Sequence, residues 1–528
     1  MTVPDLLLSP RGRRRLAAWL AIACLAPLPG CGGGGGGTSG DTSTPPPVST
    51  PFTDPTLYAT DANATLAVPS EARSVTQHRV VLASGTLDYS ATAGHLIANE
   101  VGTGKPQASF FYVAYTLNGA NPATRPVTFF YNGGPGSASL WLHMGSFGPK
   151  RLDTRMPSNQ IAGAFTLVDN AETLLDVSDL VFVDAVGTGY SQAIAPATNR
   201  SYWGVDADAK VFRDFIARYL EANGRAAAPR VIFGESYGTT RSAVLAEELE
   251  AAGIGVDGVV LLSSVLNYNT NCGVVDDAGA SCGGYLPSYA ATGAWFNRTQ
   301  PAPADVTAFV LQAMSFADER YGPALSAYLV GQALPTPQLY TDLAALTGLP
   351  ATQWQARLNL QPDVFRAELL PGQLLGRYDA RIAGAANGPL AVDGDPSLTV
   401  IQSAYIAATR RYLAQDLAYT SPTTYTDFSN AIDAWRFSHN GKSLPDTVPD
   451  LATAMTLNPR LRVLSLNGHH DLATPFQQTR SDLRRLSAQS RITFHHVAGG
   501  HMTYLDDDGR RAQRAVLADF YRSLRTTP

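Results

Sequence analysis

Short apolar runs dominate the chain between residues 127 and 510, and they are separated by stretches with apolar residues at every third or fourth position. The runs are typical of strands buried on both faces of a parallel sheet, and the longer stretches are typical of amphipathic helices. The predicted strands are VTFFYN (127–132), DLVFVDA (179–185), RVIFG (230–234), GVVLLSSV (258–265), RVLSLNG (462–468) and RITFHHV (491–497). The predicted helices include 207–223, 241–253 and 510–524. This alternation predicts an α/β fold with a mostly parallel central sheet flanked by helices.

Two segments depart from the alternation of strands and helices. Residues from about 76 to 117 switch between apolar and polar positions with turn residues between them, which predicts antiparallel strands. Residues 267–455 hold helical stretches and proline-rich joins, and strands resume at 462. We therefore predict a catalytic domain over 61–528 with a largely helical cap inserted at 267–455, the alternative being a separate C-terminal domain.

The first 60 residues lack the pattern of a folded domain. RGRRR (11–15) followed by the apolar LAAWLAIACLAPL (16–28) is typical of an export signal, and the apolar stretch is too short to span a bilayer. LPGC resembles the cleavage motif of bacterial lipoproteins, which predicts a signal over 1–31 with lipid on Cys31; an ordinary signal peptide and a free cysteine are the alternative. The Gly-, Pro-, Ser- and Thr-rich residues 32–60 predict a linker. We expect an exported protein of the bacterial cell envelope, periplasmic or held at the membrane by this lipid alone.

Composition and charge narrow the class of protein. The chain has 528 residues and a net charge of −5, and no long basic run follows the first twenty residues, so no nucleic-acid partner is expected. Cys24 and Cys31 belong to the signal. In an exported protein the other two cysteines, Cys272 and Cys282, are expected to form a disulfide, with two free thiols as the alternative. Cysteine and histidine spacings do not suggest a structural zinc site, and we expect no metal or cofactor.

A serine framed by glycines stands in GESYG at 234–238. The pattern G-x-S-x-G is only moderately specific, and GASCG at 279–283 also matches it. Ser236 follows a predicted strand and precedes a predicted helix, whereas Ser281 lies in a turn-rich stretch. A sharp strand-to-helix turn exposes a nucleophile and leaves the amide of the next residue, Tyr237, able to donate to an oxyanion. Ser236 is therefore the predicted nucleophile.

A nucleophilic serine needs a base and a group that orients the base. Asp471 in LSLNGHHDLATP follows one predicted strand, and His501 in VAGGHMTYL follows the next, so both should lie at the carboxyl edge of the sheet. We predict Ser236, Asp471 and His501 as the catalytic triad. Adjacent strand positions point to opposite faces, which makes the pair in RITFHHV a poor metal site. The competing histidines are His469, His470, His495 and His496.

A glycine turn follows the strand that ends in FFYN. In NGGPG at 132–136 such a turn can aim a backbone N–H at the reacting oxygen, and Gly134 is the expected donor. An ordinary turn at the end of a strand is the alternative.

Five motifs together resemble the serine carboxypeptidase family. NGGPGSAS, FVDAVGTGYS, GESYGTTR, NGHHD and GGHM occur in the family's order and rough spacing, over about residues 110–510. The resemblance implies an α/β-hydrolase fold with a helical cap and a serine-type carboxypeptidase that releases C-terminal residues from peptides. It also implies the triad and oxyanion donors named above. Asn132 and Glu235 would then bind the terminal carboxylate of the peptide substrate.

The resemblance gives a reason for a glutamate beside the nucleophile. If Glu235 is buried, its raised pKa keeps it protonated, and it can donate a hydrogen bond to the substrate carboxylate; an exposed glutamate without a role is the alternative. The family's second glutamate is replaced by Ser146, so the acid pair is incomplete. The same scaffold also serves acyltransferases and esterases. A non-catalytic binding module is a further alternative, which the ordered Ser, Asp and His residues oppose.

Overall fold

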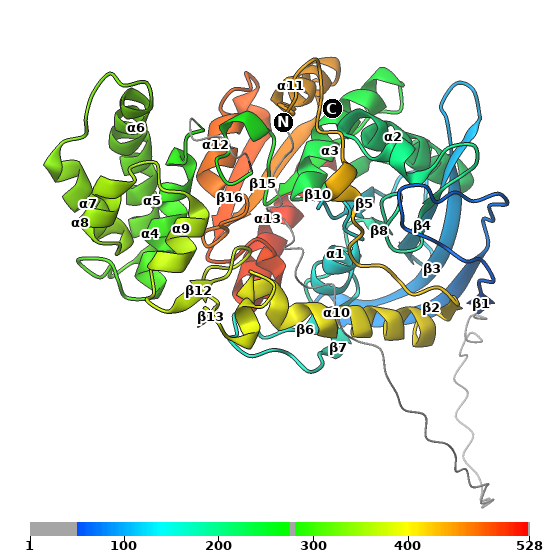
Figure 1. Cartoon of the computed structure of the whole chain (residues 1–528). Coiled ribbons are helices and arrows are strands. Elements are labelled where there is room, and N and C mark those ends of the chain that lie inside the picture. Colours follow the sequence, from blue (N-terminus) through cyan, green and yellow to red (C-terminus); the bar gives the residue numbers. More distant parts are fainter. Residues whose placement is uncertain (1–49, 275–279, 526–528) are drawn as a thin grey trace, which may run out of the picture.

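The computed structural model describes residues 50–274 and 280–525, which are built around one central sheet (Figure 1). From edge to edge its strands are β16 (Ile492–Val497), β15 (Arg462–Gly468), β11 (Gly258–Leu262), β10 (Arg230–Glu235), β5 (Val127–Tyr131), β8 (Asp179–Val183), β4 (Pro106–Leu117), β3 (Gly85–Asn99) and β2 (Arg73–Leu82). The strands from β16 to β8 pair in parallel. The pairs β8–β4, β4–β3 and β3–β2 are antiparallel, as predicted for the early strands. The predicted α/β-hydrolase fold is confirmed.

Helices cover both faces of the sheet, which explains why the central strands are apolar throughout. Side chains alternate along β5, so Phe129 packs into one core and Phe130 into the other. The first core is closed by α2 (Val205–Ala222), α3 (Tyr237–Ala251) and α11 (Val448–Leu457). The second is closed by α1 (Leu140–Gly145), α10 (Pro396–Gln415) and α13 (Asp507–Arg525). The carboxyl ends of the parallel strands therefore lie between two helical layers.

The folded domain begins earlier than the sequence pattern indicates. β1 (Phe52–Thr53) pairs in parallel with β14 (Tyr419–Thr420), and the buried Asp54 accepts hydrogen bonds from the hydroxyls of Tyr58 (2.8 Å) and Tyr419 (2.6 Å). The linker predicted over 32–60 therefore extends too far, because residues 50–60 are anchored in the fold. Their partners lie in a distant part of the chain, so local composition did not reveal the contact.

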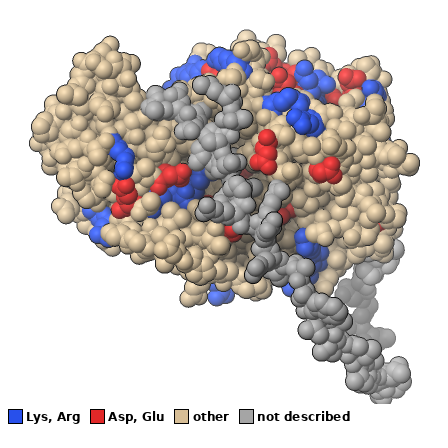
Figure 2. Space-filling model, in the orientation of Figure 1, with Lys and Arg blue, Asp and Glu red and all other residues tan. Residues whose placement is uncertain are grey.

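The predicted cap at 267–455 is also too long. Its first part forms a lobe with its own apolar core, while α10 and α11 belong to the layers that cover the sheet. The helices of the lobe are α4 (Leu286–Trp295), α5 (Val306–Phe316), α6 (Gly322–Leu329), α7 (Pro337–Thr347), α8 (Ala351–Ala356) and α9 (Pro362–Glu368). The visible face of the lobe, at the left of Figure 2, carries few charged side chains.

A few smaller elements complete the domain. They are β6 (Lys150–Asp153), β7 (Thr166–Asp169), β9 (Gln192–Ala193), β12 (Gln373–Leu375), β13 (Ala383–Ala385) and α12 (Phe476–Leu483). The predicted disulfide between Cys272 and Cys282 is present where the chain enters the lobe. Among the helices of residues 50–274 and 280–525, none is long and apolar enough to cross a bilayer.

Candidate active site

Ser236 occupies the sharp turn between β10 and α3. Its φ of 60° and ψ of −129° are a conformation that residues with a side chain rarely adopt, and such strain is typical of a nucleophile elbow. Gly234 is required here, because an added Cβ would collide with the carbonyl oxygen of Gly238. Ser236 is partly exposed, whereas Glu235 and Tyr237 on either side of it are buried. The turn therefore presents the serine hydroxyl at the carboxyl edge of the sheet.

The glycine turn at the end of β5 packs directly against this elbow. A Cβ added to Gly133 would lie 2.5 Å from the amide nitrogen of Tyr237, so only glycine permits the approach. Gly134 follows with a φ of +103°, and the amide of Ser137 donates to the carbonyl of Gly133 (3.1 Å). Tyr237 is the first residue of α3, and amides at this position lack a partner within the helix. The turn thus brings Gly134 close to the elbow, as the predicted pair of oxyanion donors, Gly134 and Tyr237, requires.

Asp471 and His501 form a hydrogen-bonded pair. The Nδ1 of His501 lies 2.8 Å from Oδ2 of Asp471, and both side chains are buried. The other carboxylate oxygen, Oδ1, accepts from the amides of Ala473 (2.8 Å) and Thr474 (2.9 Å). The Thr474 hydroxyl also lies 2.7 Å from Oδ2. With its oxygens held in this way, Asp471 fixes the imidazole so that Nε2 is the nitrogen able to exchange a proton with serine.

Neighbouring parallel strands bring the three triad residues to one edge of the sheet. Ser236 follows β10, Asp471 lies just beyond β15 and His501 just beyond β16, and β11 separates the first two strands. The end of β11 links them: the amide of Ser236 donates to the carbonyl of Leu262 (3.0 Å), and the hydroxyl of the next residue, Ser263, donates to the carbonyl of His501 (2.6 Å). The structure therefore pairs Asp471 with His501 and places Ser236 at the same edge of the sheet, as the predicted triad requires.

The charges around His501 favour its protonated form. Burial lowers the pKa of His501, but the charge and hydrogen bond of Asp471 and the charge of Glu235 raise it further, so its pKa lies above the usual value. A raised pKa makes the imidazole a stronger base for the serine proton, and it stabilises the imidazolium that forms during attack. Catalysis by this pair therefore requires a pH at which a substantial fraction of His501 is neutral.

Glu235 is buried beside the triad and is hydrogen-bonded on its inner side. Its Oε2 accepts from the hydroxyl of Tyr504 (2.9 Å). The Oδ1 of Asn132 accepts from the amide of Leu142 (3.0 Å), so the amide nitrogen of Asn132 is the atom that bonds to Glu235. Burial raises the pKa of Glu235 to about 7, against the lowering effects of the His501 charge and of the two hydrogen bonds. The alternative of an exposed glutamate is therefore wrong.

The alternative histidines and the alternative serine lie in environments that do not suit a catalytic base or nucleophile. His469 and His496 bond to each other (2.6 Å between Nε2 and Nδ1), and burial lowers the pKa of both. His470 is buried and His495 half-buried, with their pKa values also lowered by burial. The hydroxyl of Ser281 accepts from the amide of Gly283 (3.2 Å) beside the disulfide, away from any strand-to-helix turn. Within residues 50–274 and 280–525, no group of His, Cys, Asp or Glu side chains is arranged to hold a metal ion.

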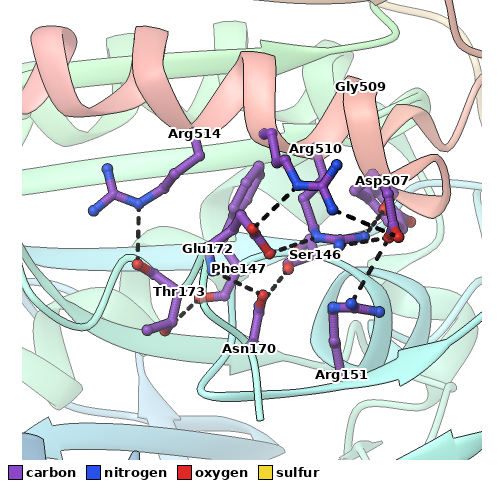
Figure 3. Close-up of polar contacts among 12 residues, drawn as sticks. Ser146, Phe147, Arg151, Asn170, Glu172, Thr173, Asp507, Gly509, Arg510 and Arg514 are labelled. Atoms are coloured by element: carbon purple, nitrogen blue, oxygen red, sulfur yellow. Dashed lines mark hydrogen bonds and ion pairs between the residues drawn. The ribbon is translucent and has the colours of Figure 1, made fainter. Parts of the chain in front are cut away.

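Ser146 does not take the place of the missing glutamate. Its side chain is buried, and its hydroxyl donates to the carbonyl of Leu142 one turn earlier (2.5 Å). Its carbonyl accepts from the side chain of Asn170 (2.8 Å), as Figure 3 shows. Nearby, the buried Arg510 bonds to Glu172 (3.2 Å), so this polar network ties α13 to the loop before β8. The Ser146 hydroxyl is committed to its own helix.

The site contains three residues that the sequence did not reveal. Thr474 supports both Asp471 and the carbonyl of Ser263, and Tyr504 supports Glu235. Tyr378, from the loop after β12, accepts from the His501 amide through its carbonyl (2.5 Å) and packs its ring 4.9 Å from the imidazole. Thr474 and Tyr504 each follow a triad residue by three positions, which is a usable signal. Tyr378 comes from the insertion and carries no local signal.

Comparisons with known proteins support the resemblance over part of the chain. The family model described as serine carboxypeptidase matches residues 83–257, which include the glycine turn and the nucleophile elbow. Among solved structures, a proline iminopeptidase of Mycobacterium smegmatis is 15% identical with a TM-score of 0.34, and the match covers 82% of this chain and 98% of that one. A peroxisomal α/β-hydrolase of Saccharomyces cerevisiae is 9% identical with a TM-score of 0.34, covering 87% and 91%.

Proposed function

We propose that this serine carboxypeptidase-like α/β-hydrolase, an enzyme of the serine hydrolase type, releases C-terminal residues from peptides through an acyl-enzyme on Ser236. The observation that carries the proposal is Glu235, a buried carboxyl next to the nucleophile whose pKa is raised to about 7. When protonated, it can donate a hydrogen bond to a terminal carboxylate, as one carboxyl can to another in a shared site. A glutamate in this position is difficult to explain for a substrate without a carboxylate, because its negative charge would oppose the oxyanion.

The proposed reaction has two stages. The Oγ of Ser236 attacks the last peptide carbonyl while Nε2 of His501 takes its proton, and the amides of Gly134 and Tyr237 stabilise the oxyanion. The C–N bond then breaks, His501 returns the proton to the leaving amine, and the terminal amino acid departs. In the second stage His501 deprotonates a water molecule, which attacks the acyl carbon. The shortened peptide leaves with a new carboxyl group and Ser236 regains its proton.

We also propose that the enzyme acts in the bacterial cell envelope, exported and attached by lipid on Cys31. This residue lies outside the described part of the chain, so the support comes from the charged and apolar run that precedes it. The disulfide between Cys272 and Cys282 agrees with an oxidising compartment. The expected partners are peptide substrates, and the membrane is contacted through the lipid alone.

Turnover of three matched substrates tests the proposal. A blocked dipeptide with a free C-terminus should be cleaved at its last bond, its C-terminal amide should be a poor substrate, and a fluorophosphonate should label Ser236. Hydrolysis of small esters without cleavage of the free-acid peptide would indicate an esterase. Transfer of the acyl group to an added alcohol in preference to water would indicate an acyltransferase, and failure to label would indicate a binding module.

A further inference from the structure

The glycine turn at 132–139 pairs with a segment that comes from the far end of the predicted insertion. This segment, residues 425–435, lies in the chain between α10 and α11 (Figure 1), and we call it the strap. Two backbone hydrogen bonds of 2.8 Å join it to the turn, from the amide of Ala138 to the carbonyl of Asp427 and from the amide of Ser429 to the carbonyl of Gly136. The turn is therefore held at its start by the elbow and along its second half by the strap.

A buried carboxyl fastens the end of the turn to the beginning of the strap. Asp184, directly after β8, accepts from the amide of Ser139 through Oδ1 (2.8 Å) and from the hydroxyl of Tyr425 through Oδ2 (2.8 Å). Burial raises the pKa of Asp184 to about 7, although both hydrogen bonds lower it. A carboxyl is costly to bury unless its hydrogen bonds offset the loss of water. The two bonds of Asp184 are therefore the structural reason for its presence here.

The strap also reaches the residue after the nucleophile. At its other end, the ring of Trp435 packs edge-on against the ring of Tyr237, with the centroids 5.2 Å apart, and both rings are buried. In between, a Cβ added to Gly136 would lie 3.1 Å from both Oγ of Ser429 and Cβ of Ala431, so the strap and the turn are in close contact. One segment thus contacts the elements that carry both predicted oxyanion donors.

A turn rich in glycine needs such external support. Glycine has more backbone freedom than any other residue, and Gly134 and Gly136 both adopt a positive φ. An oxyanion donor is effective when it is held in place before the negative charge develops. A displacement of roughly 1 Å at a reacting centre can cost about a hundredfold in rate. The contact at Gly133 fixes the start of the turn, and the strap supplies the support for the rest.

We propose that the strap positions the glycine turn for catalysis, with Tyr425 and Asp184 as positioning residues. Both side chains are buried, so they act through the turn and the amide of Gly134 rather than on the substrate. This inference rests on the proposed acyl-enzyme on Ser236. It applies equally to a peptide and to an ester, because formation and hydrolysis of the acyl-enzyme each pass through an oxyanion.

Two matched tyrosine substitutions test the inference. Tyr425→Phe removes the hydroxyl that bonds to Asp184. Tyr419→Phe is the control, because its buried hydroxyl donates to a different buried carboxyl, Asp54 (2.6 Å), which anchors residues 50–60 instead of the turn. Tyr425→Phe should lower kcat for a blocked dipeptide by about tenfold to a hundredfold, less than the loss of a whole oxyanion donor, and leave KM nearly unchanged. Tyr419→Phe should leave both constants nearly unchanged.

A transition-state analogue distinguishes positioning from a general loss of stability. A blocked peptide aldehyde forms a hemiacetal with Ser236 that resembles the tetrahedral intermediate, so Tyr425→Phe should weaken inhibition by the same factor as kcat. In a Ser236→Ala background, the Kd of the dipeptide should not change. Asp184→Ala should behave like Tyr425→Phe, and whichever of the two folds decides the question. Asp184→Asn should restore most of kcat, since its amide still accepts from Ser139 and can donate to the tyrosine hydroxyl.

Several results would overturn the inference. One is a wild-type kcat in Tyr425→Phe, and another is an equal fall of kcat in Tyr419→Phe. A rise in KM and in the dipeptide Kd at unchanged kcat would show that the strap shapes the substrate pocket, which also contradicts it.

The same kinetics with a p-nitrophenyl ester separate this inference from the proposed function. If the wild type hydrolyses the ester but not the peptide, the carboxypeptidase proposal fails and the ester kinetics decide the role of the strap. If the wild type hydrolyses neither substrate and a fluorophosphonate does not label it, both proposals fail.

Discussion

Replacing Glu235 by glutamine removes the ionisable group beside the nucleophile that we propose binds the substrate carboxylate. Glutamine has nearly the same shape and its side-chain amide always donates, whereas Glu235 donates only when protonated. Because the pKa of Glu235 is about 7, the wild type changes from donor to repelling charge across neutral pH. The substitution should therefore abolish a pH dependence rather than simply lower activity.

The expected magnitude follows from the protonated fraction. If only the protonated form binds a terminal carboxylate, the apparent affinity falls in proportion to that fraction. With a pKa of about 7, KM of the wild type for a free-acid dipeptide should rise about tenfold between about pH 6 and about pH 8. In Glu235→Gln the same KM should stay nearly flat, and a C-terminal amide should give flat profiles in both enzymes.

Steady-state kinetics should report KM separately from kcat, because His501 also titrates and its raised pKa will shape kcat. The parallel amide series shows whether any change in KM comes from the carboxylate. If the KM of Glu235→Gln for the free-acid dipeptide rises with pH as it does in the wild type, Glu235 does not bind the terminal carboxylate of the substrate. The carboxypeptidase assignment would then lose its main support.

Protein stability gives a second readout of the same substitution. Burial raises the pKa of Glu235 from the usual 4.5 to about 7 in the folded protein, so the folded state holds the proton more tightly than the unfolded state. Stability is therefore highest below the unfolded pKa, falls as pH rises through this window, and is lower by about 3 kcal/mol above the folded pKa. In urea unfolding, the advantage of Glu235→Gln over wild type should grow with pH by this amount. A difference that does not change with pH would contradict the raised pKa.

Three further predictions concern the nucleophile, the acid and the anchor. Ser236→Ala should abolish turnover and fluorophosphonate labelling, whereas Ser281→Ala should leave both nearly intact. Loss of activity in Ser281→Ala would show that the nucleophile had been assigned to the wrong serine. Asp471→Asn should lower kcat by roughly a thousandfold or more, because an amide in place of Oδ2 favours the wrong tautomer of His501, and near-normal kcat would refute the assigned roles. Intact-mass analysis of the membrane fraction should show an acylated N-terminal Cys31, and a soluble form that starts elsewhere would exclude the anchor.

The sheet and the triad could be predicted from the sequence because their signals are local. Each apolar run is long enough for one strand, and Ser236, Asp471 and His501 each stand within a few residues of the end of such a run. The nucleophile elbow also has a sequence signal of its own, because a glycine is needed at Gly234, where the backbone of α3 turns back on β10. These features depend on residues that are close together in the sequence, so they can be recognised from the sequence alone.

Features that depend on distant contacts could not be predicted in this way. Residues 50–60 have the composition of a linker, yet Asp54 is fixed by Tyr419. Helix α11 lies within the predicted insertion but packs on α3 beside the sheet. Tyr405 stands in an ordinary amphipathic helix, and only the fold brings its hydroxyl beside Gly145. The contacts that such distant segments make with the rest of the domain were therefore visible only in the structure.

Product analysis in water enriched with oxygen-18 tests the carboxypeptidase assignment most directly. A free-acid peptide of several residues would be incubated with wild type and with Ser236→Ala, and the products followed by mass spectrometry. The wild type should release residues singly from the C-terminus, and each shortened peptide should carry oxygen-18 in its new carboxyl group, since water resolves the acyl-enzyme. Ser236→Ala should leave the peptide intact. Cleavage at internal bonds, or an intact peptide in the presence of wild-type enzyme that hydrolyses esters, would contradict the assignment.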